Sequence, residues 1–271
     1  MKRTVKQEGR TKYIIEEYNS FNELINTNDS REIVLNYYYN QARTREDNAW
    51  CGASYEEAVE MLRYGWADEE KIKRVADKIG QLEKLQDITK MSFKNDIVGY
   101  APIVPLALKG VPQNMINCAR KPKKAKVINL IIDIGVSGDI TVAEKLEWGA
   151  KVLSGIIGLE KQGFRVRIDV SKVTVTDHQV HMAKVPIKNE NQPFDIKRMM
   201  FSIAHAAMQR RIFFDWYERL PEAEFHSGHG YSLSVQNSVK RAEIDKNIPN
   251  SESSYLICYG EDINEILKEV A

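Results

Sequence analysis

The chain has 271 residues, and its 39 lysines and arginines nearly balance 38 aspartates and glutamates. This near-zero net charge excludes a global field that would draw the protein to nucleic acid or to a membrane, so such binding needs a local patch. Cys51, Cys118 and Cys258 lie far apart without a C-x-x-C pair, which argues against a disulfide framework or a structural zinc site. The basic N-terminus has no apolar stretch behind it, and no run approaches the roughly 20 apolar residues of a membrane span. We therefore expect a reduced, cytoplasmic protein.

Helical patterns dominate the sequence before residue 92. Residues 33–39 fit either a strand or one face of a helix, because the periodicity does not decide between them. Ser54 and Glu57 form a capping-box pattern, Gly65 marks a helix end, and Asp68 opens a second helix, which predicts a helical hairpin over residues 54–87.

Residues 92–126 are rich in proline and glycine, which forbids long regular elements and predicts an ordered connection. Residues 1–126 are therefore expected to form an α-rich N-terminal region that ends in this connection.

A strand–helix–strand pattern begins at Val127. The continuous apolar run of residues 127–134 predicts a strand that is covered on both faces, and residues 142–162 predict a long helix. Two alternating segments around Asp177 predict a β-hairpin at the sheet edge. A helix with a break near Gln209, a buried strand in SYLICYG and a terminal helix follow. Residues 127–271 are thus expected to form a three-layer α/β domain of about four strands.

The stretch VINLIIDIGVSGDIT places Asp133 at the end of the predicted strand, where open α/β sheets gather their ligands. Asp133 and Ser137 offer hard oxygen atoms that suit Mg²⁺, and the N-terminus of the following helix favours an anion nearby. The alternative is purely structural, because an Asp at a strand end often caps the next turn, and Asp139 or Thr141 can cap this helix.

Residues 127–271 resemble a von Willebrand factor A-type domain. Asp133 to Ser137 reads D-x-G-x-S, which is similar to the D-x-S-x-S of that family's metal-ion-dependent adhesion site, with Gly135 in place of one hydroxyl. The order of helix, strand, antiparallel edge strand, helices and buried strand is similar as well. The resemblance implies a Mg²⁺ held by Asp133, Ser137 and Asp262, with a carboxylate of a protein partner completing the coordination.

Basic residues supply a different candidate site, for a nucleic acid or another anion. The basic run ends at Lys126, and a second pair of cations lies in a predicted helix. The residues are Arg120, Lys121, Lys123, Lys124, Lys126, Arg210 and Arg211. The simpler interpretations are a solvated loop for the run, and ion pairs with Asp215 and Glu218 for the arginine pair.

Several short blocks resemble a largely uncharacterised family of bacteriophage proteins. They are Trp50-x-Gly52-x-x-Tyr55-x-x-Ala58, Pro105-x-x-Leu108-x-Gly110-x-Pro112, the D-x-G-x-S strand, Leu159-Glu160-x-x-Gly163-x-x-Val166, and Phe201 through His205 to Arg210-Arg211-x-x-Phe214. This resemblance implies a phage origin and action in the host cytoplasm, and it implies no activity.

No common nucleotide-binding, hydrolase or metalloprotease motif occurs in the chain. The pair His226 and His229 has the H-x-x-H spacing, but its glycines favour a polar loop over a zinc site. We therefore expect an interaction protein rather than an enzyme. The alternatives are a nucleic-acid-associated phage factor and a metal-dependent phosphoester hydrolase with Asp133 and Asp139 as ligands.

Overall fold

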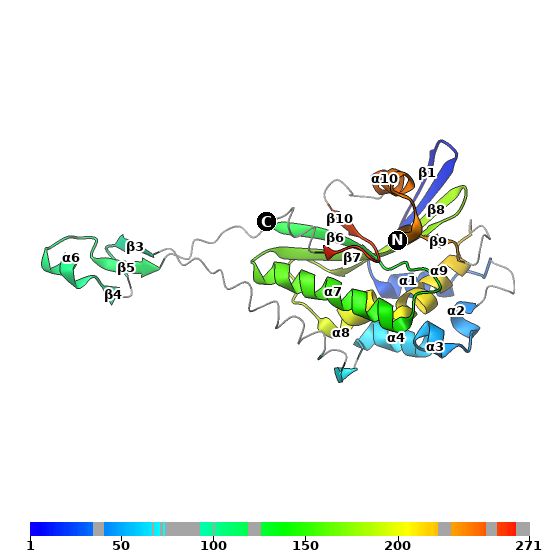
Figure 1. Cartoon of the computed structure of the whole chain (residues 1–271), viewed down its shortest axis with the longest axis horizontal. Coiled ribbons are helices and arrows are strands. Elements are labelled where there is room, and N and C mark those ends of the chain that lie inside the picture. Colours follow the sequence, from blue (N-terminus) through cyan, green and yellow to red (C-terminus); the bar gives the residue numbers. More distant parts are fainter. Residues whose placement is uncertain are drawn as a thin grey trace.

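The computed structural model describes residues 1–34, 41–66, 68–70, 73, 93–99, 101–118, 126–221, 229–247 and 254–263. Within these ranges the chain forms a mixed α/β fold with one large sheet, in the strand order β1-β2-β8-β7-β6-β10 and with β9 paired to β7 (Figure 1). The strands are β1 (Lys2–Glu8), β2 (Thr11–Glu17), β6 (Val127–Asp133), β7 (Arg165–Val175), β8 (Gln179–Lys188), β9 (Tyr231–Ser232) and β10 (Tyr255–Ile257).

The predicted strand–helix–strand unit is confirmed. β6 runs into α7 (Val142–Lys161), and β7 returns parallel to β6, with Asp133 opposite Ser171. Thr141 caps α7 through a complete capping box with Glu144. The hairpin of β7 and β8 also forms, and β10 is parallel to β6.

The expected position of the hairpin at the sheet edge is wrong. β2 pairs in parallel with β8, and β1 then forms the edge strand, so β8 lies inside the sheet. This explains why β7 and β8 are buried along nearly their whole length instead of having one wet face. The sheet therefore takes strands from both sides of the expected division at residue 126.

Helical segments cover one face of the sheet, and a smaller layer covers the other. Leu130 and Ile132 of β6 pack on the larger helical layer, whereas Ile131 packs with Leu233 and Ile244 on the other side. The elements of the first layer are α1 (Phe21–Asp29), α2 (Gln41–Thr44), α3 (Asn48–Cys51), α4 (Tyr55–Tyr64), α7, α8 (Ile196–Met199), η2 (Met200–Ala204), η3 (Met208–Phe213) and α9 (Phe214–Glu218). The second layer contains η4 (Leu233–Val235) and α10 (Ser238–Asn247).

The helix predicted over residues 195–220 is interrupted earlier than expected. Its two middle segments, η2 and η3, are π-helical turns, and the chain leaves helical geometry at His205, whose backbone is extended. π-Helical turns are rare and often occur at functional sites. After this break, η3 lies beside the loop that follows β6, where Gln209 bonds the Val136 backbone.

The first helix of the predicted hairpin is confirmed as α4, with the Ser54–Glu57 capping box and Gly65 at its end. The second helix and the predicted terminal helix fall almost wholly outside the described residues. A separate small sheet comprises β3 (Phe93–Asp96), β4 (Ala101–Pro102) and β5 (Met115–Cys118), with α6 (Val104–Leu108). None of the helices in the described ranges has the length and hydropathy needed to cross a bilayer.

Candidate functional site

Asp133 ends β6 as a fully buried carboxylate. Its Oδ1 accepts a hydrogen bond of 2.8 Å from the backbone N–H of Val173, and its Oδ2 has no hydrogen-bond partner among the described residues. Burial raises the pKa of Asp133 to about 6, although the ammonium of Lys172 acts in the opposite direction. The ionised form of the group is therefore disfavoured at the end of the strand.

Lys172 lies on β7 beside Asp133 and is also buried. Its Nζ donates to the carbonyl of Val173 at 2.7 Å, and burial lowers its pKa to about 8. A Cβ atom on Gly135 would lie 3.1 Å from both Asp133 Oδ2 and Lys172 Nζ. Gly135 thus leaves room between the two charged groups, which is a steric reason for the glycine in the D-x-G-x-S motif.

The three predicted metal ligands do not line a common cavity. Asp133 is buried next to the ammonium of Lys172, whose charge opposes a cation. The Ser137 side chain hydrogen-bonds the exposed Asp139, and Asp262 lines a different cavity. No three His, Cys, Asp or Glu side chains of the described residues are grouped so that they could hold a metal ion. The ammonium of Lys172 therefore disfavours a divalent cation at Asp133.

A cavity of about 350 Å³ lies beside the loop that follows β6. Its walls come from the N-terminal segment 41–50, the loop after β6, β7, the π-helical turn η3 with the start of α9, and the segment 229–235. The lining residues are Gln41, Arg45, Trp50, Val136, Ser137, Gly138, Lys172, Gln209, Arg210, Phe214, His229, Gly230, Tyr231, Ser232 and Val235. We call this space the strand-end cavity.

Arg210 is buried and connects the two sides of the strand-end cavity. Its guanidinium donates to the carbonyl oxygens of Trp50 and Ile140, and it lies over the Trp50 ring at 4.2 Å from the centroid. Arg45 contacts the same ring at 4.3 Å. Trp50 Nε1–H donates to the carbonyl of Gly138 at 2.8 Å, so the indole is fixed between two cations and the loop.

Arg211 has a structural role in the same turn. Its guanidinium donates to the carbonyls of Ala53, Ala42 and Arg45 at 2.9, 3.0 and 2.8 Å, and to Asn48 Oδ1 at 2.8 Å. Arg211 thereby holds the segment that carries Arg45 against η3.

The ion pairs expected for the arginine pair are not formed. Asp215 binds Arg43 and Arg219 instead, and Glu218 accepts from the N–H groups of Gln41 and Ala42. Both predicted acidic partners are thus occupied by other groups, most of them from the N-terminal region. The arginine pair instead donates mainly to neutral carbonyl groups.

Gln209 and Lys145 fix the loop after β6. Lys145 Nζ donates to the Ile134 carbonyl at 2.8 Å and to Gln209 Oε1 at 2.9 Å. Gln209 Nε2 donates to the Val136 carbonyl at 2.9 Å, and its Oε1 accepts from the Val136 N–H at 3.2 Å. The loop backbone is therefore held in a fixed position beside the cavity.

The charge around the strand-end cavity is unbalanced. Lys145, Lys172 and Arg210 are each no more than 2% exposed, and none forms an ion pair with a carboxylate of the described residues. Burial lowers the pKa of all three groups, well below the usual value for Lys145. No described Asp or Glu lines the cavity. The carboxylate of Asp133 partly offsets the charge of Lys172, and that of Asp47 partly offsets the charge of Arg210. Buried cations without a directly paired carboxylate remain costly, so an anion in this cavity would relieve that cost.

The family of the chain follows from a match over nearly its full length. The model of one family, described as a domain of unknown function (DUF7192), matches residues 3–269. The chain belongs to the DUF7192 family. Searches of curated proteins and of solved structures find no match.

Apart from His229, the other predicted residues of this DUF7192 protein lie away from the strand-end cavity or outside the described ranges. Arg120, Lys121, Lys123 and Lys124 belong to the latter group, as does His226. Lys126 is exposed just before β6 begins, whereas Arg210 binds beyond the end of that strand. The strand between these two points spans about 20 Å. Lys126 and Arg210 therefore do not form one continuous patch.

His229, whose spacing to His226 suggested zinc, has a different environment in this DUF7192 chain. Its Nε2 lies 2.8 Å from Glu218 Oε1, and its ring stacks on Phe214 with centroids 3.8 Å apart. It forms part of the aromatic wall of the strand-end cavity.

Two further residues at this site could have been found by their positions. Lys172 lies on the same face of β7 as the buried residues Ile168 and Val170, because side chains two residues apart on a strand share a face. Lys145 lies on the buried face of α7. A lysine on an apolar face is a signal that the sequence carries. Arg45 carries no such signal, because only the tertiary fold brings it to the strand-end cavity.

Proposed function

We propose that the protein binds a small phosphate-bearing ligand of mononucleotide size in the strand-end cavity. The observation that carries the proposal is the buried positive charge of Arg210 and Lys172 in a cavity that no described carboxylate lines. Asp47 and Asp133 offset this charge only from outside the cavity lining. Arginine and lysine side chains are the usual phosphate-binding groups in proteins. The position also supports it, because ligands of open α/β sheets bind beyond the carboxyl ends of strands.

The aromatic wall favours a ligand that also carries a planar ring. Trp50, Phe214 and Tyr231 line the cavity together with Val136 and Val235. Its volume of about 350 Å³ falls in the range of small-molecule sites, roughly 300–1,000 Å³. A nucleotide provides both the phosphate and the ring.

Calorimetric titration tests this proposal. We expect 5′-mononucleotides to bind, and the matching nucleosides to bind at least about tenfold more weakly, since one charge-assisted contact contributes about 1.5–3 kcal/mol. Lys172→Met and Arg45→Gln are expected to weaken nucleotide binding, and Lys151→Gln serves as a distant control. Equal affinity for nucleoside and nucleotide would refute a phosphate site.

The nucleic-acid alternative shares this chemistry, because a strand terminus presents the same phosphate and base. Arg210, which the sequence singled out for that function, lines the strand-end cavity. A short single-stranded oligonucleotide with a 5′-phosphate, compared with the same oligonucleotide without it, separates the two cases. Tighter binding of the phosphorylated oligonucleotide than of a mononucleotide would favour a nucleic-acid-associated factor.

Metal-dependent binding of a protein partner, a likeness to von Willebrand factor A-type domains and a phage origin in the host cytoplasm stay predictions. The unpartnered Oδ2 of Asp133 is the one feature of the described residues in favour of a cation, and the neighbouring Lys172 opposes it. Thermal melting with and without Mg²⁺ tests the site. A melting temperature that Mg²⁺ leaves unchanged in the wild type and in Asp133→Ala alike would remove it.

A further inference from the structure

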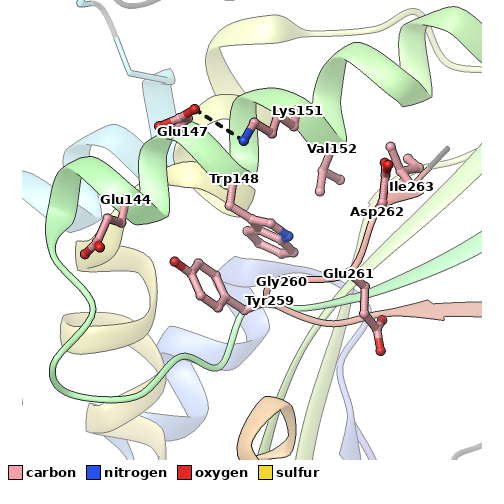
Figure 2. Close-up of a pocket in the computed structure, with 10 residues that line it drawn as sticks. All are labelled: Glu144, Glu147, Trp148, Lys151, Val152, Tyr259, Gly260, Glu261, Asp262 and Ile263. Atoms are coloured by element: carbon pink, nitrogen blue, oxygen red, sulfur yellow. Dashed lines mark ion pairs between the residues drawn. The ribbon is translucent and has the colours of Figure 1, made fainter. Parts of the chain in front are cut away.

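A second cavity, of about 490 Å³, lies between the first half of α7 and the segment that follows β10. Figure 2 shows the indole of Trp148 and the phenol of Tyr259 projecting into this space from its two sides. We call it the α7 cavity. Its lining residues are Glu144, Glu147, Trp148, Lys151, Val152, Tyr259, Gly260, Glu261, Asp262 and Ile263.

The charge of the α7 cavity is opposite to that of the strand-end cavity. Four of its lining side chains are carboxylates and one is the ammonium of Lys151, which pairs with Glu147 at 3.3 Å. Glu261 pairs with Arg241 at 3.1 Å, so the two ion pairs offset two of the four negative charges. Burial is the largest cause of a raised pKa at Tyr259, and the carboxylates of Glu144 and Asp139 raise it further. A negative potential of this kind attracts a cation.

The aromatic pair gives this potential a defined shape. The rings of Trp148 and Tyr259 are 5.5 Å apart and inclined at 52°, so they form an open angle rather than a stack. Tryptophan and tyrosine faces are the preferred aromatic partners of organic cations. Carboxylates and aromatic rings together are suited to an ammonium or guanidinium group.

Trp148 also points to a ligand independently of the acidic residues. The side chain is only 7% exposed, and its Nε1–H has no hydrogen-bond partner among the described residues. A buried donor without an acceptor is unfavourable. The ligand is therefore expected to carry a hydrogen-bond acceptor near its cation.

We propose that the α7 cavity binds the basic side chain of a lysine or arginine residue from another polypeptide. The side-chain cation lies among the carboxylates and the two aromatic rings, and a peptide carbonyl of the same segment accepts the Trp148 Nε1–H. A peptide meets both requirements, whereas a simple polyamine supplies the cation without the acceptor. This site is separate from the strand-end cavity and does not depend on the function proposed for it.

NMR titration of the full chain with short capped peptides tests this inference. The peptides are acetyl-Gly-Lys-Gly-amide and acetyl-Gly-Arg-Gly-amide, with acetyl-Gly-norleucine-Gly-amide as the uncharged match and putrescine as the cation without an acceptor. We expect the basic peptides to shift the Trp148 indole resonance and to bind at least about fivefold more tightly than either comparison compound.

Variants of the α7 cavity complete the test. Asp262→Asn changes an exposed residue, and Trp148→Phe keeps a ring but removes the N–H donor. Each is expected to weaken the basic peptides several-fold, whereas Lys172→Met in the strand-end cavity leaves them unchanged. Equal binding of the norleucine peptide, or an unchanged affinity in Asp262→Asn, would overturn the inference. Putrescine binding as tightly as the lysine peptide would also overturn it, in favour of a small polycation.

Discussion

Gly149 in the middle of α7 makes a very close helix contact in the first layer, and replacing it with alanine tests that packing. A Cβ atom on Gly149 would lie 2.4 Å from both Cα and Cβ of Ala204, and 3.1 Å from its backbone nitrogen. Ala204 ends the π-helical turn η2, so the obstacle is backbone that cannot rotate away. The two segments must separate to admit one methyl group.

The magnitude comes from two opposing effects. Carbon atoms pack best at about 3.5–4.0 Å, so the new contact is more than about 1 Å too short. Overpacking of this kind costs about 1–3 kcal/mol, whereas alanine in place of glycine stabilises a helix by about 1 kcal/mol. Gly158 provides the control, because it lies in the same helix and a Cβ there would meet nothing within 4 Å.

Urea denaturation of the two variants isolates the free-energy cost of the close contact, because both variants make the same change in helix propensity. We expect Gly158→Ala to be more stable than the wild type by up to about 1 kcal/mol, and Gly149→Ala to be less stable than Gly158→Ala by about 1–3 kcal/mol. This corresponds to roughly 2–12 °C in melting temperature for a domain of this size class. Equal free energies of unfolding for the two variants would refute the close packing of α7 on η2.

Three other variants test the buried charges. Asp133→Asn keeps the acceptor for the Val173 N–H and removes a carboxyl group whose pKa is raised to about 6. Because the pKa of this carboxyl group is higher in the folded than in the unfolded state, the wild type loses stability as pH rises from about 4 to about 6. In denaturation curves, the free energy of unfolding of Asp133→Asn should therefore exceed that of the wild type by about 1–3 kcal/mol at pH 7 and by little at pH 4. Arg211→Met leaves several carbonyls without donors and should cost at least about 3 kcal/mol, measured by urea unfolding. Asp215→Asn disrupts the ion pairs with Arg43 and Arg219 and should lower the free energy of unfolding by about 3–5 kcal/mol, measured by thermal melting. A decrease below about 1 kcal/mol would contradict a buried ion-pair network.

The predictable parts of the fold are the elements whose residue pattern is contained in one continuous segment of the sequence. The apolar run before Asp133 and the capping box at Thr141 specify β6 and the start of α7 locally. β2 is not predictable in this way, because its apolar core is short and its parallel partner β8 lies far along the chain. Nothing in a local pattern identifies such a partner.

The same division applies to the candidate site. Asp133 and Arg210 can be identified from their own surroundings, and both lie at the strand end. Their roles are not predictable, because Asp133 depends on Lys172 of β7 and Arg210 depends on Trp50 of α3, and only the tertiary fold brings these pairs together. The metal prediction rests on oxygen atoms alone, and only the tertiary fold brings the ammonium of Lys172 beside Asp133.

The pairing of β2 with β8 has a consequence for how the protein is made. Lys12 pairs with Gln179, so the first hairpin leaves the ribosome long before its neighbour exists. At about 5–20 residues per second, β2 waits roughly 10–30 seconds with one edge unpaired. That edge carries Tyr13, Ile14 and Ile15, which are buried in the folded protein. An apolar strand edge left open for this time favours aggregation, and a chaperone that covers it during synthesis should raise the yield of folded protein.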